Sequence, residues 1–139
     1  MDTKTDIVDL IRKKDTFAHH LSIKIIEAAG GRSHVTMPLN ERTANALGNV
    51  HGGAIFAIAD VAFAAASNSE GILSVAIEAN MHYMAPLLSE GRLDAKAEKI
   101  KETRRLGFYR IEIFPPDGDV IAVCQAVAYR KGSNQTKNV

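Results

Sequence analysis

The chain has 139 residues, a length suited to one domain with a substantial core. Its 17 basic and 16 acidic residues give a formal charge of +1, so the composition does not imply a broad basic surface for nucleic acid or other polyanions. The single cysteine, Cys124, excludes an internal disulfide framework and a thiolate metal cage. The single cysteine suits the reducing cytoplasm, and the polar N-terminus does not resemble a signal peptide. With the balanced charge, these features favour a cytoplasmic protein without nucleic-acid or membrane partners.

A short helix and two strands are predicted before the first long loop. Apolar residues at helical spacing predict an amphipathic helix over about residues 5–14. Apolar and polar residues then alternate over 21–25, as in a half-buried strand, and the preceding pair His19-His20 is interpreted as a solvated entry to that strand. Gly30-Gly31 separates it from a second strand, which ends near Met37-Pro38.

The most informative segment is the apolar run HGGAIFAIADVAFAAASNS, which begins at His51 after a loop over 40–50. Its Ala, Ile, Val and Phe content favours a long helix that is hydrophobic on nearly every side. Asp60 is the only charged residue between Gly52 and Ser69, and the residues three and four positions away on either side are apolar. An unpaired carboxylate is costly to bury there, so Asp60 indicates either a dedicated partner or a catalytic task.

Four further strands are predicted after this helix. The segment after Gly71 is extended, and the strands around 93–97 and 109–113 alternate between apolar and polar residues. The last strand runs over 120–129 after a Pro-Pro-Asp-Gly turn, and a polar tail starts near Lys131. The face predicted for the first of these strands consists of Val75, Ile77, Ala79, Met81 and Tyr83.

This order of elements predicts an α+β fold, in which an antiparallel sheet packs around one central helix. The central run is just long enough to suggest a membrane span, but its Ala-rich content, central carboxylate and polar end indicate a core helix. No repeat or second domain is visible, so residues 1–139 are interpreted as a single domain. A single sheet of this kind leaves a strand edge exposed, which favours the pairing of two sheets in a dimer.

One motif carries a resemblance to a known family. It consists of Asn45-x-x-Gly48-x-x-His51-Gly52-Gly53, then Asp60, then Tyr83-Met84-Ala85-Pro86. This spacing resembles the hotdog-fold acyl-CoA thioesterases, and among them it is most similar to the phenylacetate-pathway, PaaI-like branch. The resemblance implies a curved antiparallel sheet around one long helix, with sheets paired in a homodimer and dimers commonly paired into tetramers. It also implies an acyl-CoA substrate and no metal or redox cofactor.

The resemblance also implies roles for particular residues. Asp60 would act as general base or nucleophile on the thioester carbonyl, and the Gly52 amide would bind the developing oxyanion. Asn45 and His51 would position the carbonyl or the attacking water. These roles agree with the physical chemistry, because a helix N-terminus presents unpaired N–H groups and a positive partial charge. Gly52 and Gly53 have no side chains, which lets a substrate approach this backbone closely.

Other residues are expected to hold the substrate. Arg104 and Arg105, at a predicted hairpin, are candidates for the phosphates of coenzyme A, because the forked guanidinium matches phosphate oxygens. Phe63 and Tyr83 are expected to line an apolar acyl pocket, and Phe56, Met81 and Met84 are further candidates. Phe56 and Phe63 would also raise the pKa of Asp60 by desolvation.

The position of Asp60 predicts that two protomers share each active site. Asp60 follows His51 by nine residues, about 13 Å along a helix axis. This is too far for both to contact one carbonyl from the same helix. In the family the carboxylate of one protomer faces the helix start of the other, which would bridge this gap.

Several points stay open from the sequence. Some relatives have Ser or Thr where Ala76 stands. Because this chain lacks that hydroxyl, it stays open whether Asp60 activates water or attacks directly. His82 stands where an acidic residue is frequent, which leaves substrate preference open. Glu78, Asn80 and His82 share one strand face and could suggest a metal site, but they supply only two possible ligands, without a third at recognised spacing. A non-catalytic acyl-CoA-binding module and a hotdog hydratase or dehydratase are alternative functions.

Overall fold

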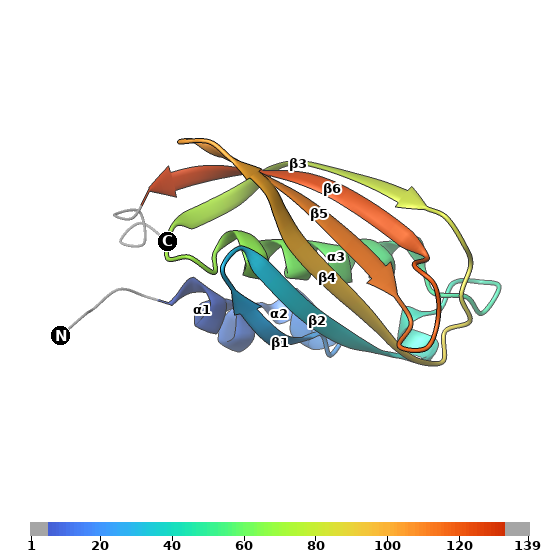
Figure 1. The fold of residues 1–139 in the computed structure, drawn as a ribbon. Helices are drawn as coiled ribbons and strands as arrows, with labels where there is room; N and C mark the ends of the chain where they lie inside the picture. Colours follow the sequence, from blue (N-terminus) through green and yellow to red (C-terminus); the bar gives the residue numbers. More distant parts are fainter. Residues whose placement is uncertain (1–5, 133–139) are drawn as a thin grey trace.

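The computed structural model describes residues 6–132, and in it six strands form one antiparallel sheet that curves around a central helix (Figure 1). The helical elements are α1 (Ile7–Lys14), α2 (Thr16–His20), the short 3₁₀ helix η1 (Glu41–Thr43) and α3 (Gly52–Ser67). The strands are β1 (Lys24–Ala29), β2 (Arg32–Leu39), β3 (Leu73–Tyr83), β4 (Gly91–Glu102), β5 (Leu106–Phe114) and β6 (Ala122–Gly132). The predicted architecture, an antiparallel sheet around one long helix, is confirmed.

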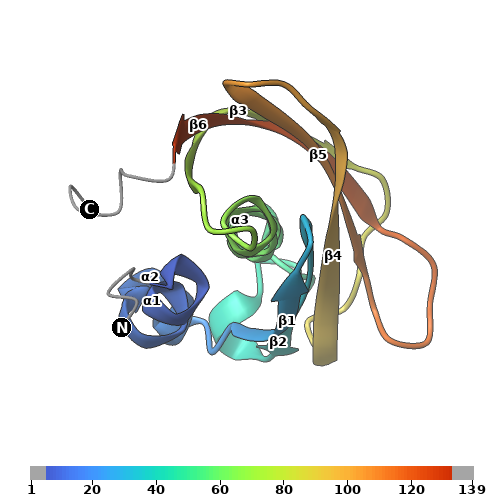
Figure 2. The ribbon, with the colours of Figure 1, turned by 60° about the vertical axis from the view of Figure 1, so that its left-hand side comes forward.

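The strand order across the sheet is β1-β2-β4-β5-β6-β3. After β2 the chain leaves the sheet, forms α3, and returns as β3 at the far edge beside β6. The two edge strands are therefore β1 and β3. Figure 2 looks along α3: the sheet curves over two of its sides, and α1 and α2 lie beneath it.

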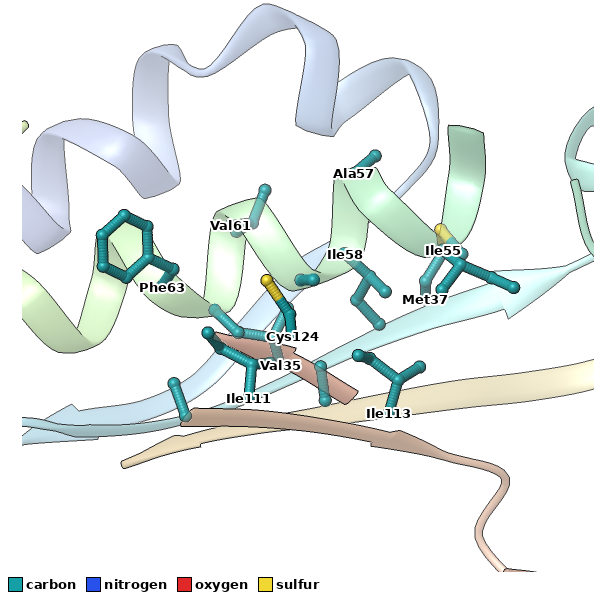
Figure 3. Packing of buried hydrophobic residues seen from close by; sticks show 14 of the residues in the cluster. Val35, Met37, Ile55, Ala57, Ile58, Val61, Phe63, Ile111, Ile113 and Cys124 are labelled. Carbon is teal, nitrogen blue, oxygen red and sulfur yellow. The ribbon is translucent and has the colours of Figure 1, made fainter. Parts of the chain in front are cut away.

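The core forms where α3 meets the inward side chains of the sheet (Figure 3). Ile58 lies at the centre of α3 and is fully buried, as are Ile111 and Ile113 on β5. Phe63 packs edge-to-face on Tyr109, with ring centroids 5.5 Å apart. Because each fully buried large aliphatic side chain contributes about 1.5–3 kcal/mol, these contacts fix the position of α3 against the sheet.

The structure corrects the interpretation of residues 16–25. His19 and His20 do not enter a strand; they form the last turn of α2. The Asp15 carboxylate caps this short helix by accepting the Ala18 backbone N–H at 3.0 Å. Ser22, at φ 57°, then redirects the chain, and β1 begins only at Lys24.

The predicted single face of β3 is also wrong. The register of β3 against β6 shifts between Ala76 and Glu78, so Ile77 is the extra residue of a β-bulge. A bulge reverses the alternation of side chains, and Val75 therefore points to the opposite face from Met81. Ala76, Ala79, Met81 and Tyr83 share the side that faces the core, because they pair with the buried alternate residues of β6.

Several boundaries also moved relative to the predictions. The first helix, predicted over about 5–14, begins at Ile7. The last strand begins at Ala122 and continues through Lys131, where a polar tail was predicted; the rest of that tail, 133–139, lies outside the described residues. Within 6–132, no helix combines the length and apolar character that a membrane span requires.

Candidate active site

His51 is the N-cap of α3, and its side chain is fixed by the first turn of the helix. Its Nδ1 accepts the Gly53 backbone N–H at 2.8 Å. Because a backbone N–H can only donate, Nδ1 is unprotonated in the neutral ring and Nε2 carries the proton. A Cβ on Gly53 would lie 3.0 Å from Nδ1, so glycine at this position makes room for the ring. The cap therefore leaves an exposed Nε2–H donor at the start of α3.

One backbone amide at this helix start is left without an acceptor. The His51 N–H donates to the Thr43 carbonyl at 2.7 Å, and the Ala54 and Ile55 amides donate to the His51 carbonyl. Gly53 donates to the His51 ring. Within the described part of the chain, the Gly52 N–H has no such partner, and Gly52 is half-buried. It is the group that the sequence analysis predicted as the oxyanion donor, and it lies where the partial positive charge of α3 is greatest.

The loop before α3 is closed on itself by Asn45. Its Oδ1 accepts the backbone N–H groups of Leu47 at 2.9 Å and Asn49 at 3.0 Å. Its own backbone N–H donates to the Asn49 carbonyl at 2.7 Å. Gly48 adopts φ +82°, a left-handed conformation that explains the glycine. Because Oδ1 is engaged, only the NH₂ group of Asn45 remains to bind another molecule.

Several hydrogen bonds that the sequence did not reveal hold this loop to the β3–β4 connection. The Thr43 and Ser89 hydroxyls are 2.8 Å apart and buried, and Ser89 donates to the Asn40 carbonyl at 2.8 Å. The Val50 N–H donates to the Leu87 carbonyl at 2.8 Å. Thr43 follows the capping residue Asn40 by three positions, a spacing that could have indicated its role in the capping box. The contact between Thr43 and Ser89 spans 46 positions, so no local sequence pattern indicates it.

These segments enclose a pocket of about 310 Å³ at the start of α3. The polar part of its lining consists of Asn45, Asn49 and Gly52. The apolar part consists of Val50, Ile55, Tyr83, Met84, Ala85, Pro86 and Leu87. The Tyr83 hydroxyl donates to the Gly52 carbonyl at 3.3 Å, so its ring lies against the glycine that carries the free amide. The predicted residues Asn45, Gly52 and Tyr83 are therefore brought together in one pocket, and the cap residues His51 and Gly53 adjoin it.

Asp60 lies apart from this pocket. It follows Gly52 by eight residues, about 12 Å along the helix axis. Asp60 was predicted to be buried, but its side chain is exposed. Together with Gly53 and Phe56 it forms an exposed stripe on α3, while the flanking residues Ala59 and Val61 are buried. The stripe is the part of α3 that neither the sheet nor α1 and α2 cover.

The surroundings of Asp60 nevertheless perturb its titration. Restricted hydration among the apolar neighbours raises the pKa of the carboxyl above its ordinary value, and the negative charge of Asp15 raises it further. The predicted direction is thus confirmed, although Asp15, from the α1–α2 connection, was not foreseen. Cys124 lies on β6 in the core, where burial raises the pKa of its thiol; a hydrogen bond from the Asn80 backbone lowers it, and the charge of Asp60 raises it slightly further. The thiol is 3% exposed, as expected for a core residue.

The remaining predicted residues lie elsewhere in the chain. Phe63 is 3% exposed and points into the core, so it does not line the pocket. Arg104 and Arg105 are exposed in the β4–β5 turn, at the end of α3 opposite to Gly52 (Figure 1). Arg105 donates to the Tyr129 hydroxyl at 3.1 Å. Within residues 6–132, no three His, Cys, Asp or Glu side chains are grouped as a metal site would require.

Comparison with known proteins gives a consistent family. Residues 47–122 match the family model of the thioesterase superfamily. Acyl-coenzyme A thioesterase PaaI of Escherichia coli is 32% identical over 124 residues, covering 89% of this chain and 89% of that protein. The solved structure of E. coli PaaI, from the phenylacetic acid degradation operon, is similar with a TM-score of 0.84 at 31% identity, over 89% of this chain and 90% of that one. A mutant of the phenylacetic acid degradation protein PaaI of Thermus thermophilus gives a TM-score of 0.78 at 32% identity, over 82% and 97%.

The chain belongs to the thioesterase superfamily and has the hotdog fold. The predicted resemblance to the PaaI-like branch and the predicted enzyme class, a thioester hydrolase, are confirmed by these relatives.

Proposed function

We propose that the protein hydrolyses an acyl-CoA thioester to a carboxylic acid and free coenzyme A, with the Gly52 amide as oxyanion donor and Asp60 as general base or nucleophile. The free Gly52 N–H at the start of α3 is the observation that carries the proposal, because it is a backbone donor without an acceptor in a pocket of substrate size. The acyl-CoA specificity is taken from the E. coli relative of that name. An aromatic acyl group is one candidate, given the phenylacetic acid degradation operon of that relative.

The thioester carbonyl oxygen would accept the Gly52 N–H, with the Nε2–H of His51 and the NH₂ of Asn45 as further donors at the pocket. When the carbonyl carbon is attacked, negative charge moves onto this oxygen and strengthens these hydrogen bonds. In the general-base route, Asp60 removes a proton from water as the water oxygen bonds to the carbonyl carbon. The tetrahedral intermediate then breaks its C–S bond, and the proton passes to the departing thiolate.

In the nucleophilic route, an Asp60 oxygen bonds to the carbonyl carbon and the C–S bond breaks, which leaves a mixed anhydride that water hydrolyses. A single turnover in ¹⁸O-labelled water detects the nucleophilic route when water attacks the anhydride at the Asp60 carbonyl. Hydrolysis of an anhydride at the Asp60 carbonyl places ¹⁸O in the protein, which peptide mass spectrometry detects. The general-base route places ¹⁸O in the carboxylic acid product alone.

We also propose that the working unit is a homodimer or a dimer of dimers, in the cytoplasm. The exposed stripe around Asp60 and the unpaired edge of β3 support pairing of two chains, with the Asp60 of one chain facing the Gly52 of the other. Arg104 and Arg105 are proposed to hold coenzyme A phosphates. An antiparallel arrangement of two α3 helices would bring the β4–β5 turn of one chain toward the pocket of the other. Phe63 would then influence the substrate only through the packing of α3.

The function is tested with a panel of short, medium, long and aromatic acyl-CoAs, read out by a thiol-reactive dye. Thiol release by the wild-type protein that is lost in a folded Asp60→Asn variant supports the proposal. Binding of acyl-CoA without thiol release would instead support a non-catalytic module. A change in enoyl-CoA absorbance without thiol release would support a hydratase.

A further inference from the structure

A second pocket lies between the α1–α2 segment and β1, with Val61 of α3 in its lining. Its volume is about 480 Å³, within the range of small-molecule sites. Its apolar lining comes from Ile11, Ala18, Ile23, Ile25 and Val61. It shares no lining residue with the pocket at the start of α3, so the two are separate sites. We call it the α2–β1 groove.

The local fold explains why this groove stays open. α2 has only five residues, and the chain turns at Ser22 directly into the edge strand β1. The short helix cannot cover the full length of β1, and Ile23 and Ile25 therefore line the groove below it. His19 Nε2 lies 2.8 Å from the Arg12 carbonyl, and because a carbonyl only accepts, this bond fixes α2 to α1 at the groove's rim.

The charged residues of the groove all have the same sign. Arg12 and Lys24 line it, and no carboxylate does. Among the ion pairs of residues 6–132, neither cation takes part in one. An apolar cavity with two basic side chains and no acidic one fits a molecule that carries an apolar chain and a single anionic head.

We propose that the α2–β1 groove binds an aliphatic carboxylate, with its chain against the apolar lining and its carboxylate at Arg12 and Lys24. The site is separate from the proposed hydrolytic site. A carboxylic acid is also the product class of the proposed function, but binding in the groove does not require Asp60 or Gly52. The proposal therefore stands or falls independently of the hydrolytic activity.

The proposal is tested by calorimetry with sodium butanoate, hexanoate and octanoate. Each methylene that enters the groove should tighten binding about two- to fourfold, because it leaves water for an apolar lining. Octyltrimethylammonium, which has the same chain and the opposite charge, should bind at least tenfold more weakly than octanoate. Equal binding of both octyl compounds, or no octanoate binding at millimolar concentration, would overturn the proposal.

Variants locate the site. Arg12→Gln with Lys24→Gln should weaken octanoate binding about tenfold or more, whereas the matched control Lys13→Gln, on the same helix but outside the groove, should not change it.

In isoleucine methyl NMR spectra, octanoate should shift Ile11, Ile23 and Ile25 and leave Ile55, in the first pocket, unchanged. The Asp60→Asn protein should bind octanoate as the wild type does. Shifts confined to Ile55 would assign the carboxylate to the hydrolytic site and refute the groove.

Discussion

At the scale of single residues, Asp60 combines an exposed carboxylate with a raised pKa, on a helix whose other residues are apolar or small. Its apolar neighbours along α3 were visible in the sequence and correctly indicated a raised pKa. Its exposure was not visible, because that depends on which stripe of the helix the sheet leaves uncovered. The same holds for Asp15, which approaches Asp60 only through the folding of α1 and α2. Because the carboxylate is exposed in the single chain, the cost of burial does not itself require a partner there, and the catalytic role of Asp60 stays a proposal.

Asp60→Asn should lower kcat by about two to four orders of magnitude, the usual effect of removing a positioned acid or base. The amide keeps the shape of the side chain but cannot accept a proton or form an anhydride. The measurement is acyl-CoA hydrolysis by protein whose circular dichroism spectrum matches the wild type. Near-normal hydrolysis by such a variant would remove Asp60 from the mechanism.

The raised pKa of Asp60 predicts the pH dependence of activity. The carboxylate must be ionised to act, so kcat/KM should fall on the acid side at a pH above the ordinary aspartate pKa of about 3.9. Asp15→Asn removes a neighbouring negative charge, and the acid limb should therefore move to lower pH, while Asp9→Asn, on α1, serves as the control. An acid limb that does not move would show that Asp15 is too far away to influence the reaction.

The same shift predicts an effect on stability. Between the unfolded and folded pKa values the folded state binds more protons at Asp60, so its stability decreases as pH rises through this window. At neutral pH the ionised carboxylate therefore destabilises the fold, and Asp60→Asn should melt no lower than the wild type. Thermal melts at pH 4 and pH 7 measure this: the advantage of the variant should be larger at pH 7.

His51 combines a structural bond and a chemical donor, and the two can be separated. His51→Ala should cost about 0.5–2 kcal/mol of stability, because the Gly53 amide loses its cap. His51→Asn offers an equivalent cap and should restore most of that stability. It presents no Nε2–H, so its kcat should stay below that of the wild type. Full activity in a stable His51→Asn protein would show that His51 acts only as the helix cap.

At the scale of elements, the long and strongly patterned segments were predicted well. α3 was recognised because its apolar residues extend over four turns, and β4 and β5 because their residues alternate regularly. α2 was missed because five residues carry too little periodicity. The bulge at Ile77 was missed because a regular alternation in sequence does not reveal where one residue drops out of the pairing. The pairing partner β6 decides that, and it lies more than forty residues later.

The β4–β5 turn is held by a cluster of ion pairs, which bears on its two arginines. Lys99 Nζ contacts Glu70 just beyond α3 and Glu102 at the end of β4, at 2.5 and 2.8 Å. Arg130 Nη1 lies 2.9 Å from Glu102 as well. Arg105 is engaged with the Tyr129 hydroxyl, whereas Arg104 has no side-chain partner within the described residues. Arg104 is therefore the better placed of the two for a phosphate.

Replacing both Arg104 and Arg105 by Ala should raise KM for acyl-CoA several-fold or more and leave kcat largely intact, because a charge-assisted phosphate contact is worth about 1–3 kcal/mol. Arg104→Ala alone should account for most of the effect, and added salt should reduce it. An acyl-pantetheine substrate, which lacks the nucleotide phosphates, is the control and should show little change. An equal loss on both substrates would indicate that the turn acts through folding or assembly.

At the scale of the whole molecule, the two halves of the proposed chemistry are on one chain but too far apart to meet. The free Gly52 amide and the Asp60 carboxylate are separated by about 12 Å along a rigid helix. Large apolar residues are exposed on the bulged edge strand and beside Asp60: Val75 at 40%, Ile77 at 58% and Phe56 at 36%. The strand edge and the helix stripe together leave an unpaired surface that a second copy of the chain would cover.

A shared site makes a quantitative prediction for mixed dimers. Asp60→Asn and Asn45→Ala chains should each be nearly inactive as homodimers, since every site then lacks one partner's contribution. After equal mixing and subunit exchange, half of the dimers are hybrids, and one of the two sites in each hybrid combines an intact Asn45 with an intact Asp60. The mixture should therefore recover about a quarter of wild-type activity. Mixing Asp60→Asn with the Asp60→Asn, Asn45→Ala double variant is the control and should recover none. If mass spectrometry shows that hybrids have formed and the first mixture is still inactive, Asp60 and Gly52 do not act across two chains.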